Sequence, residues 1–501
     1  MRLNSPKLAA MLLLVCASVC PAAYTEFYCD SVNGSNLNSG STTSGTATYT
    51  ATNGGWDSTT GVFTPASGNP SSSVNVGDFA SIYNDGASVA VFVGRVTAVN
   101  STTITVSLTA KMGTAPSTAG TGKSCKVGGA WQGPVSNQTW PLSNGNPPQG
   151  VLTNAAGDEP RFNFKNNGSY VLTTNLSSGT ITGPITLEGY TTTPGDGGQA
   201  TFSTSTNNVG WGINGTFVRM VGFQFSCTAS GGTAANLTYG VTNGVIHRCT
   251  SNGARSHGIS CTGANTVVSE CEAYDNNKSN GGSAAGFFTT TGCEFDRCIS
   301  HDNAGSNTSG FLWTGANTLL AFNRCIADTN GSHGFAKPSG STSSSSVAIK
   351  GCEAYNNGGS GVFVVPPTNG ITFAIENCNF VKNAAYGIEG SGSNLRNGYI
   401  RNCGFGAGTQ ANTSGDTTSL GNVIVEGSVS YASNVTPWTD PANGDFRVSL
   451  STAKAAGRGT FLQTQSGYAG TVGYPDIGAA QHQDAGGGSG YPKSRIVNHA
   501  Q

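Results

Sequence analysis

Charged side chains are scarce in this chain of 501 residues, at 10% of the sequence, whereas about a quarter of an average soluble domain is charged. The 24 Lys and Arg nearly balance the 25 Asp and Glu, which leaves a formal net charge of -1. Binding of nucleic acid by phosphate neutralisation needs a basic excess or patch, so we do not expect a nucleic-acid partner. Helical stretches rich in Glu, Lys and Ala are missing. Beyond the N-terminus, no segment is long and apolar enough to predict a membrane span.

Glycine, in contrast, is abundant. There are 73 glycines, about 15% of the chain against a usual share of roughly 7%. Ser, Thr and Asn are also frequent, yet 36% of the residues are hydrophobic, which is too many for a simply disordered polymer. Few charges, much glycine and many β-branched residues predict an all-β protein with very many turns.

The N-terminus has the layout of a secretory signal. Arg2 and Lys7 provide a positive start, residues 8–19 are apolar, and residues 21–23 are small. The apolar stretch is too short for a membrane-spanning helix. We therefore predict a signal peptide over residues 1–23 and a secreted, extracellular mature protein, typical of a bacterial export pathway.

Cysteines recur at a nearly fixed period. Eight of them are separated by intervals of 22, 22, 27, 27, 27, 26 and 25 residues: Cys227, Cys249, Cys271, Cys298, Cys325, Cys352, Cys378 and Cys403. An asparagine follows five of these cysteines after five residues: Asn276, Asn303, Asn330, Asn357 and Asn383. Beyond each asparagine comes a glycine followed by a large apolar residue, as in Gly310-Phe311. Three features in register predict a repeat architecture.

The repeat predicts a solenoid of short strands. A coil of this length cannot bury an apolar face alone, so coils must stack at about 4.8 Å and share one core. Cysteine fits a core column, asparagine tolerates a left-handed turn and can bond along its column, and we expect each glycine at a positive φ. Parallel stacking favours free thiols over disulfides. Outside the ladder, Cys29 with Cys125 and Cys261 with Cys293 are possible bridges.

Over about residues 165–440 the sequence resembles the right-handed parallel β-helix proteins of the pectate-lyase-like group. Residues 183–198 (GPITLEGYTTTPGDGG) resemble a lead-in segment, residues 27–41 a first strand and turn, and residues 440–483 a closing module. The resemblance implies an all-β, right-handed parallel β-helix with an N-terminal β-rich region and a C-terminal closing segment. This fold hosts many activities, so it does not by itself imply one.

The chain then divides into five parts. We expect the signal peptide at 1–23, a β-rich region at 24–165, the β-helix at 166–437, the closing module at 438–483 and a flexible tail at 484–501. Apolar residues at every second place in 78–108 indicate strands, and this β-rich region could be inserted between the first strand and the helix.

Equal offsets from the cysteines identify neighbours on the outer surface. Asp275 and Asp302 lie four residues after their cysteines, while His301 and Asp328 lie three residues after theirs. These four residues are predicted to form one cluster, in which paired carboxylates can bind Ca²⁺ or divide acid and base roles in glycoside hydrolysis. The alternative is that the aspartates only cap turns beside the asparagine ladder.

Other candidates surround this cluster. The turns at 277–285 and 304–309 are longer than in other coils and would form a lip, or they are neutral insertions. Arg297 and Arg324 belong to a column one place before the cysteines, which is either a surface charge ladder or a strip that binds uronates. His333 and Lys337 follow the Asn330 turn, and a lysine with a depressed pKa can accept a proton.

The repeats also resemble polysaccharide lyase family 9, whose members are pectate lyases with a calcium site and a lysine base. That resemblance implies Lys337 as the base, although it lies one residue later than the family pattern. The family's metal-binding acids precede the Gly-aromatic steps, where this chain has residues 284–285 (Ala-Ala) and 308–309 (Thr-Ser). Ca²⁺ is therefore the candidate cofactor, but no metal ligands are assigned.

These observations predict a secreted β-helix protein that acts on or binds a polysaccharide, as a lyase or a glycoside hydrolase if it is an enzyme. The alternative is a non-catalytic glycan-binding adhesin or a tailspike-like surface protein. The predicted catalytic residues are Lys337, Asp275 and Asp302. The predicted substrate-binding residues are His301, Asp328, Arg297, Arg324 and His333.

Overall fold

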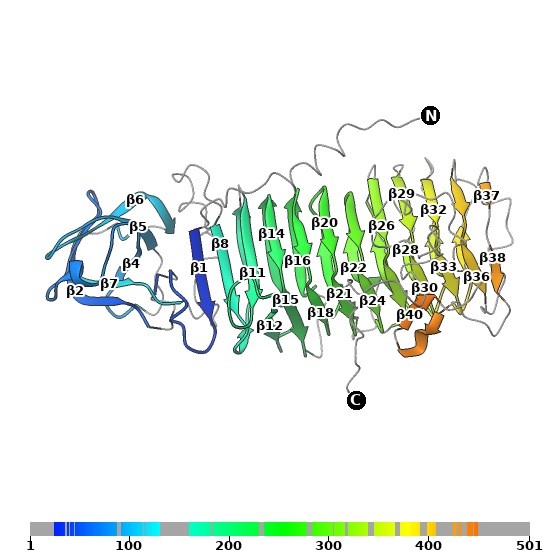
Figure 1. Cartoon of the computed structure of the whole chain (residues 1–501), viewed down its shortest axis with the longest axis horizontal. Coiled ribbons are helices and arrows are strands. Elements are labelled where there is room, and N and C mark those ends of the chain that lie inside the picture. Colours follow the sequence, from blue (N-terminus) through cyan, green and yellow to red (C-terminus); the bar gives the residue numbers. More distant parts are fainter. Residues whose placement is uncertain are drawn as a thin grey trace, which may run out of the picture.

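A computed structural model describes most of the chain between residues 25 and 448 (Figure 1). The described residues exclude 1–24, 36–37, 40, 45, 88–91, 114, 118, 131–159, 182–183, 230–234, 278–282, 304, 316–318, 339–344, 366–370, 391–397, 407–423, 427–428, 432–437, 444 and 449–501. The predicted signal peptide, the flexible tail and most of the closing module lie outside the described residues. Within the described part, no helix has the length and apolar character needed to span a membrane.

Three long sheets of parallel strands run side by side along the molecule (Figure 1). The twelve-stranded sheet contains β1 (Thr25–Asp30), β8 (Pro160–Lys165), β11 (Ile185–Tyr190), β14 (Val218–Val221), β17 (Val245–His247), β20 (Thr266–Ser269), β23 (Cys293–Asp296), β26 (Leu319–Asn323), β29 (Ser345–Lys350), β32 (Ile371–Glu376), β35 (Tyr399–Arg401) and β37 (Ile424–Glu426). The eleven-stranded sheet contains β9 (Ser169–Val171), β12 (Ala200–Thr204), β15 (Phe223–Cys227), β18 (Thr250–Asn252), β21 (Glu272–Tyr274), β24 (Ile299–His301), β27 (Ile326–Asp328), β30 (Glu353–Tyr355), β33 (Asn379–Val381), β36 (Gly404–Gly406) and β38 (Val429–Tyr431). The nine-stranded sheet contains β10 (Leu176–Ile181), β13 (Trp211–Thr216), β16 (Leu237–Thr242), β19 (Ile259–Cys261), β22 (Ala284–Thr289), β25 (Thr308–Trp313), β28 (Phe335–Lys337), β31 (Val362–Val364) and β34 (Ile388–Gly390).

Each coil from β8 to β34 contributes one strand to each sheet, so the chain forms the predicted right-handed parallel β-helix. Alternate residues of every strand point inward, and one continuous apolar core runs through the helix. Equivalent aromatic rings stack along it: Phe311 lies 5.1 Å from Phe287 and 4.9 Å from Phe335, ring centre to ring centre. The fold prediction is confirmed.

A closed antiparallel barrel follows β1 and precedes β8 in the sequence, and it lies beyond β1 at the N-terminal end of the helix (Figure 1). Its strands are β2 (Tyr49–Asp57), β3 (Val62–Thr64), β4 (Phe79–Asn84), β5 (Phe92–Val99), β6 (Ile104–Gly113) and β7 (Gly120–Val127), with one 3-10 turn, η1 (Pro70–Ser72). Phe79 of the barrel packs 4.9 Å from Phe27 of β1. The barrel therefore covers the N-terminal end of the helix core, which a stacked repeat must otherwise expose.

The predicted asparagine ladder is present and fully buried. The five side chains are at most 2% exposed. The first four amide nitrogens donate to the amide oxygen one coil on, as from Asn303 to Asn330 at 2.7 Å and from Asn330 to Asn357 at 2.9 Å. The backbone N–H of Asn330 also donates to Asn357 Oδ1 at 3.1 Å. The ladder thus satisfies polar groups that burial would otherwise leave unpaired.

The reason for the recurrent glycines differs from our expectation. The residue just before each ladder asparagine takes the left-handed conformation, for example Asp302 at φ 50° and Thr329 at φ 49°. The glycines serve close packing instead. A Cβ on Gly334 would lie 2.7 Å from the Gly361 carbonyl oxygen, a separation that real Cβ atoms do not tolerate.

The cysteine ladder has seven members, not eight. The strand register places Phe223 one coil before Cys249, whereas Cys227 pairs with Thr204 at the far end of β15. Phe223 therefore fills the ladder position in that coil. The interval of 22 residues between Cys227 and Cys249 fits the repeat length, but the two cysteines do not occupy equivalent positions in their coils.

All twelve described cysteines are buried free thiols, as expected for the ladder. The two suggested bridges are not formed. Cys29 belongs to the helix core and Cys125 to the barrel core, so separate packing units hold them apart. Cys261 and Cys293 are hydrogen-bonded thiols, and this hydrogen bond lowers the pKa of Cys293 to about 7.

The C-terminal described segment folds back onto the eleven-stranded sheet. It consists of β39 (Trp438–Asp440), the 3-10 turn η3 (Pro441–Asn443) and β40 (Asp445–Val448), and its two strands pair antiparallel. We call these residues the closing hairpin. Trp438 and Phe446 lie 5.4 Å and 6.0 Å from Tyr355 of β30.

Replacing Asn330 by Ala tests the ladder. The substitution removes amide bonds in both directions and leaves buried carbonyl and N–H groups unpaired, so we expect a loss of about 2 kcal/mol or more in the free energy of unfolding. Urea unfolding measures the change. Asn356→Gly is the control, because Asn356 is exposed and left-handed, a conformation that glycine adopts freely. Equal stability of the two variants would contradict the ladder's energetic role.

Candidate active site

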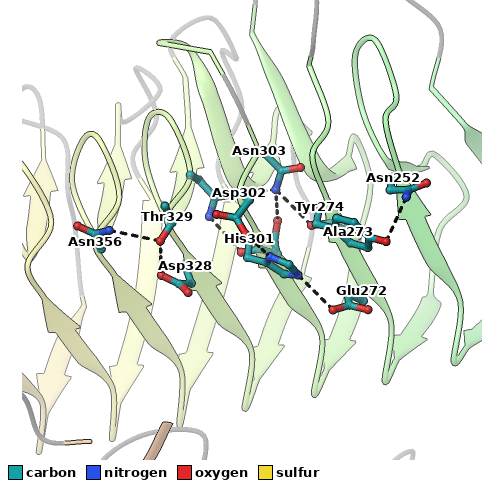
Figure 2. Close-up of polar contacts among 12 residues, drawn as sticks. Asn252, Glu272, Ala273, Tyr274, His301, Asp302, Asn303, Asp328, Thr329 and Asn356 are labelled. Carbon is teal, nitrogen blue, oxygen red and sulfur yellow. Dashed lines mark hydrogen bonds and ion pairs between the residues drawn. The ribbon is translucent and has the colours of Figure 1, made fainter. Parts of the chain in front are cut away.

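A polar column runs along the outer surface of the eleven-stranded sheet (Figure 2). The parallel register places Tyr274 of β21 beside His301 of β24, and His301 beside Asp328 of β27. Glu272 and Asp302 flank His301 on either side. We call Glu272, Tyr274, His301, Asp302 and Asp328 the His301 site. Its side chains lie close together because the strands are short and each one ends at the equivalent turn of its own coil.

Both nitrogens of the His301 ring bind carboxylates. Nδ1 lies 2.8 Å from Asp302 Oδ2, and Nε2 lies 3.1 Å from Glu272 Oε1. The ring also stacks on Tyr274 at 5.1 Å between ring centres and 10° between planes. Burial opposes protonation of His301, but the bonds to Asp302 and Glu272 outweigh it and raise the pKa to about 9. At neutral pH the site therefore contains an imidazolium between two carboxylates.

Asp328 has a different environment from Asp302. Burial raises the pKa of Asp328 to about 6, and the negative charge of Asp302 adds to this effect. The Thr329 hydroxyl donates to Asp328 Oδ1 at 2.7 Å and partly opposes it. Asp302 is instead 51% exposed and paired with the His301 cation. The two carboxyl groups on neighbouring coils therefore have different surroundings, a raised pKa at Asp328 and an exposed carboxylate bonded to His301 at Asp302.

Asp275 occupies the same turn position as Asp302, one coil earlier. Its φ of 52° shows that it serves the left-handed turn before Asn276. The two enlarged turns that we predicted as a lip also meet, since the amide nitrogen of Asn277 donates to the Thr308 hydroxyl. Residues 278–282 and 304 of these turns lie outside the described residues.

Arg297 and Arg324 lie on another edge of the coil, at the turn that leads out of the twelve-stranded sheet. Arg297 contacts Glu270 at 2.8 Å and Asp296 at 3.2 Å, and Arg324 pairs with Asp296. Both arginines have positive φ, so the column also forms a left-handed turn. Their geometry is that of a charge ladder along the surface.

Lys337 and His333 belong to the nine-stranded sheet and the turn before it. Lys337 is 1% exposed and pairs with Val364 in the strand register, and burial lowers its pKa. His333 stacks on Phe363 at 4.2 Å, and its Nδ1 accepts the Ser360 N–H at 2.9 Å. Burial lowers the pKa of His333 to about 4. Neither residue is part of the His301 site.

The cysteine offsets identified His301, Asp302 and Asp328, but they missed Glu272. This residue follows Cys271 directly, and the alternation of the strand places it on the same outer face as Tyr274. The alternation of inward and outward residues in this strand was therefore the sequence signal that could have identified Glu272. Within the described ranges, no three carboxylate, imidazole or thiol side chains converge as a metal site would require.

One family model agrees with the fold. Residues 225–389 match the family described as Right handed beta helix region. No curated protein matches the sequence. Among solved structures, the chain is similar to pectate lyase Pel9A (18% identity, 65% of this chain and 88% of that chain, TM-score 0.47). It is also similar to the Dettilon tailspike protein gp208 (13% identity, 56% of this chain and 54% of that chain, TM-score 0.40). A third similar structure is the periplasmic alginate epimerase AlgG (11% identity, 55% of this chain and 77% of that chain, TM-score 0.35).

The raised pKa of His301 gives a pH-dependent contribution to stability. Because its folded-state pKa (about 9) exceeds its ordinary value (6.5), the contribution is full below pH 6.5 and is lost as pH rises through 9. We expect His301→Gln to be less stable than the native chain by up to about 3 kcal/mol at the lower pH, with the gap closing above pH 9. The difference is measured from the free energies of unfolding of both proteins between about pH 6 and pH 10.

His247→Gln serves as the control for this pH dependence. Burial lowers the pKa of His247, so its contribution changes only below the ordinary pKa of 6.5 and stays constant above it. The charged groups that face His301 are Glu272, Asp302 and Asp328, and all three remain in the variant. A pH-independent gap for His301→Gln would show that the imidazolium is not held as described.

Proposed function

We propose that this protein is an exported enzyme that hydrolyses a polysaccharide at the His301 site, with Asp328 as proton donor and Asp302 as base. The observation that carries the proposal is the pair of carboxyl groups on neighbouring coils, one with a raised pKa and one paired with a cation. The secretory layout of residues 1–23 supports export.

The chemistry follows from these two environments. With a pKa of about 6, Asp328 keeps a proton near neutral pH in part of the molecules and can donate it to the glycosidic oxygen as the C–O bond breaks. Asp302 accepts a proton from the attacking water, whose oxygen forms the new bond to the sugar carbon. The contact between His301 Nδ1 and Asp302 Oδ2, at 2.8 Å, holds the carboxyl group in place for this role.

The surface around the site suits a sugar chain. On the N-terminal side of its charged groups the outward positions carry hydroxyl, amide and aromatic side chains, at Ser226, Asn252 and Tyr274, which can bind sugars through hydrogen bonds and ring contacts. Asn252 and Tyr274 extend the column beyond His301, and the Asn252 amide donates to the Tyr274 hydroxyl at 3.1 Å. Both side chains are partly exposed.

A non-catalytic glycan-binding role, as in an adhesin or a tailspike-like surface protein, is the second candidate. The observation that favours it is the engagement of both His301 nitrogens, which fixes the ring as a positioning residue. A lyase mechanism with Lys337 as base has less support, because Lys337 is buried on another sheet.

The experiment incubates the mature protein with a panel of uronate and neutral glycans, with and without Ca²⁺. Reducing ends and the absorbance of unsaturated products are recorded. We expect new reducing ends without unsaturated products, and a loss of about 100-fold or more in rate for Asp328→Asn and for Asp302→Asn. Glu294→Gln, on the exposed face of the twelve-stranded sheet, is the control with unchanged rate.

Three outcomes would contradict hydrolysis at this site. Turnover that both aspartate variants retain would exclude their roles. Unsaturated products abolished by Lys337→Ala would instead support the lyase. Retention of a glycan without any product would support the binding role.

A further inference from the structure

We infer that the His301 site takes the end of a sugar chain, because the outer face that carries it is open on one side and closed on the other. This inference rests on the proposed function, since it specifies which part of the polysaccharide the same site accepts. It depends on the burial of equivalent outward residues along the eleven-stranded sheet and on the position of the closing hairpin.

Outward residues on the N-terminal side of the site are accessible. The second outward position of each strand is partly exposed from β12 to β21, at Ser203, Ser226, Asn252 and Tyr274. These side chains form a continuous strip that leads to His301, with one residue per coil. A chain lying parallel to the helix axis can follow this strip across several coils.

The same positions are buried on the C-terminal side. Tyr355 and Val381 are 6% and 0% exposed, and their neighbours Glu353 and Asn379 are both 0% exposed. All four side chains belong to β30 and β33 and point away from the helix core, as the alternation of the strands requires. His301 is itself only 7% exposed because its own neighbours in the site pack around its ring, whereas at Tyr355 the covering groups come from the closing hairpin.

The closing hairpin covers Tyr355. Trp438 and Phe446 pack edge-on against its ring and lie 5.2 Å from each other, and they are 2% and 5% exposed. The hairpin lies across the sheet at β30 (Figure 1). The three rings are already packed together, so they form a wall rather than a surface on which a sugar can stack.

This wall begins one strand beyond the proton donor. Asp328 and Tyr355 are direct partners in the parallel register, at a strand spacing of about 4.8 Å. A chain that approaches along Asn252, Tyr274 and His301 therefore ends near Asp328. The bond placed at Asp328 and Asp302 is then close to a terminus of the chain, which gives chain-end cleavage rather than cleavage at internal bonds.

The product pattern tests this inference with the glycan that the panel identifies. Chain-end cleavage gives one small product size from the first time point, while the viscosity of the polymer falls slowly. Mixed product sizes with an early loss of viscosity would overturn the inference and leave hydrolysis at the site intact. Absence of both turnover and binding for every glycan would overturn the proposed function and this inference together.

Variants of the wall test its role directly. Trp438→Ala removes the ring that closes the face, and we expect loss of the single product size in favour of mixed sizes. Trp438→Phe keeps an aromatic wall and should restore the single size. An unchanged pattern in a folded Trp438→Ala protein, checked by its circular dichroism and unfolding midpoint, would show that the hairpin does not close the face.

Binding gives a readout that needs no turnover. Long and short chains of the same glycan are compared with Asp328→Asn, or with the native protein if it does not cleave. Recognition of chain ends predicts equal affinity when concentrations are expressed as molar chain ends. Affinity that follows the mass of sugar instead of the number of ends would overturn the inference.

Discussion

The constraint behind this structure is the spacing of about 4.8 Å between parallel coils, which places every residue beside its own equivalent. A column is stable only if its residue type interacts well with a copy of itself. Asparagine does so because its amide both donates and accepts, and the Asn276–Asn383 ladder uses both functions in every coil. Phenylalanine rings stack in the same way. Repeated like charges would repel, and this explains why charged residues are scarce.

The same constraint shows how a site arises on such a surface. The outward column of β21, β24 and β27 departs from repetition, with an aromatic, a cationic and an acidic side chain in successive coils. Neighbours that differ can attract one another, and His301 is charged because Glu272 and Asp302 lie within hydrogen-bonding distance. The more exposed Asp302 pairs with this cation, while burial raises the pKa of Asp328.

Features that repeat with the coils could be predicted from the sequence, whereas the packing of segments far apart in the sequence could not. The asparagine ladder and the proximity of His301, Asp302 and Asp328 followed from equal offsets, which also grouped Asp275 with them, while the free thiols followed from the parallel stacking of the coils. Cys227 was wrongly counted as a member of the cysteine ladder, because the spacing alone does not show that Phe223 occupies the ladder position in that coil. The hairpin that covers Tyr355 has no periodic signal, since Trp438 lies far along the chain. Its place is set by packing.

The central claim is that Asp328 holds its proton to a higher pH than an ordinary aspartate, beside the charged His301. Titration of the Asp328 carboxyl carbon by NMR, assigned with Asp328→Asn, tests it most directly. We predict a midpoint near pH 6 that rises further in His301→Gln, because the cation that favours ionisation is lost. A midpoint near the ordinary value of 3.8, unchanged in that variant, would contradict the account.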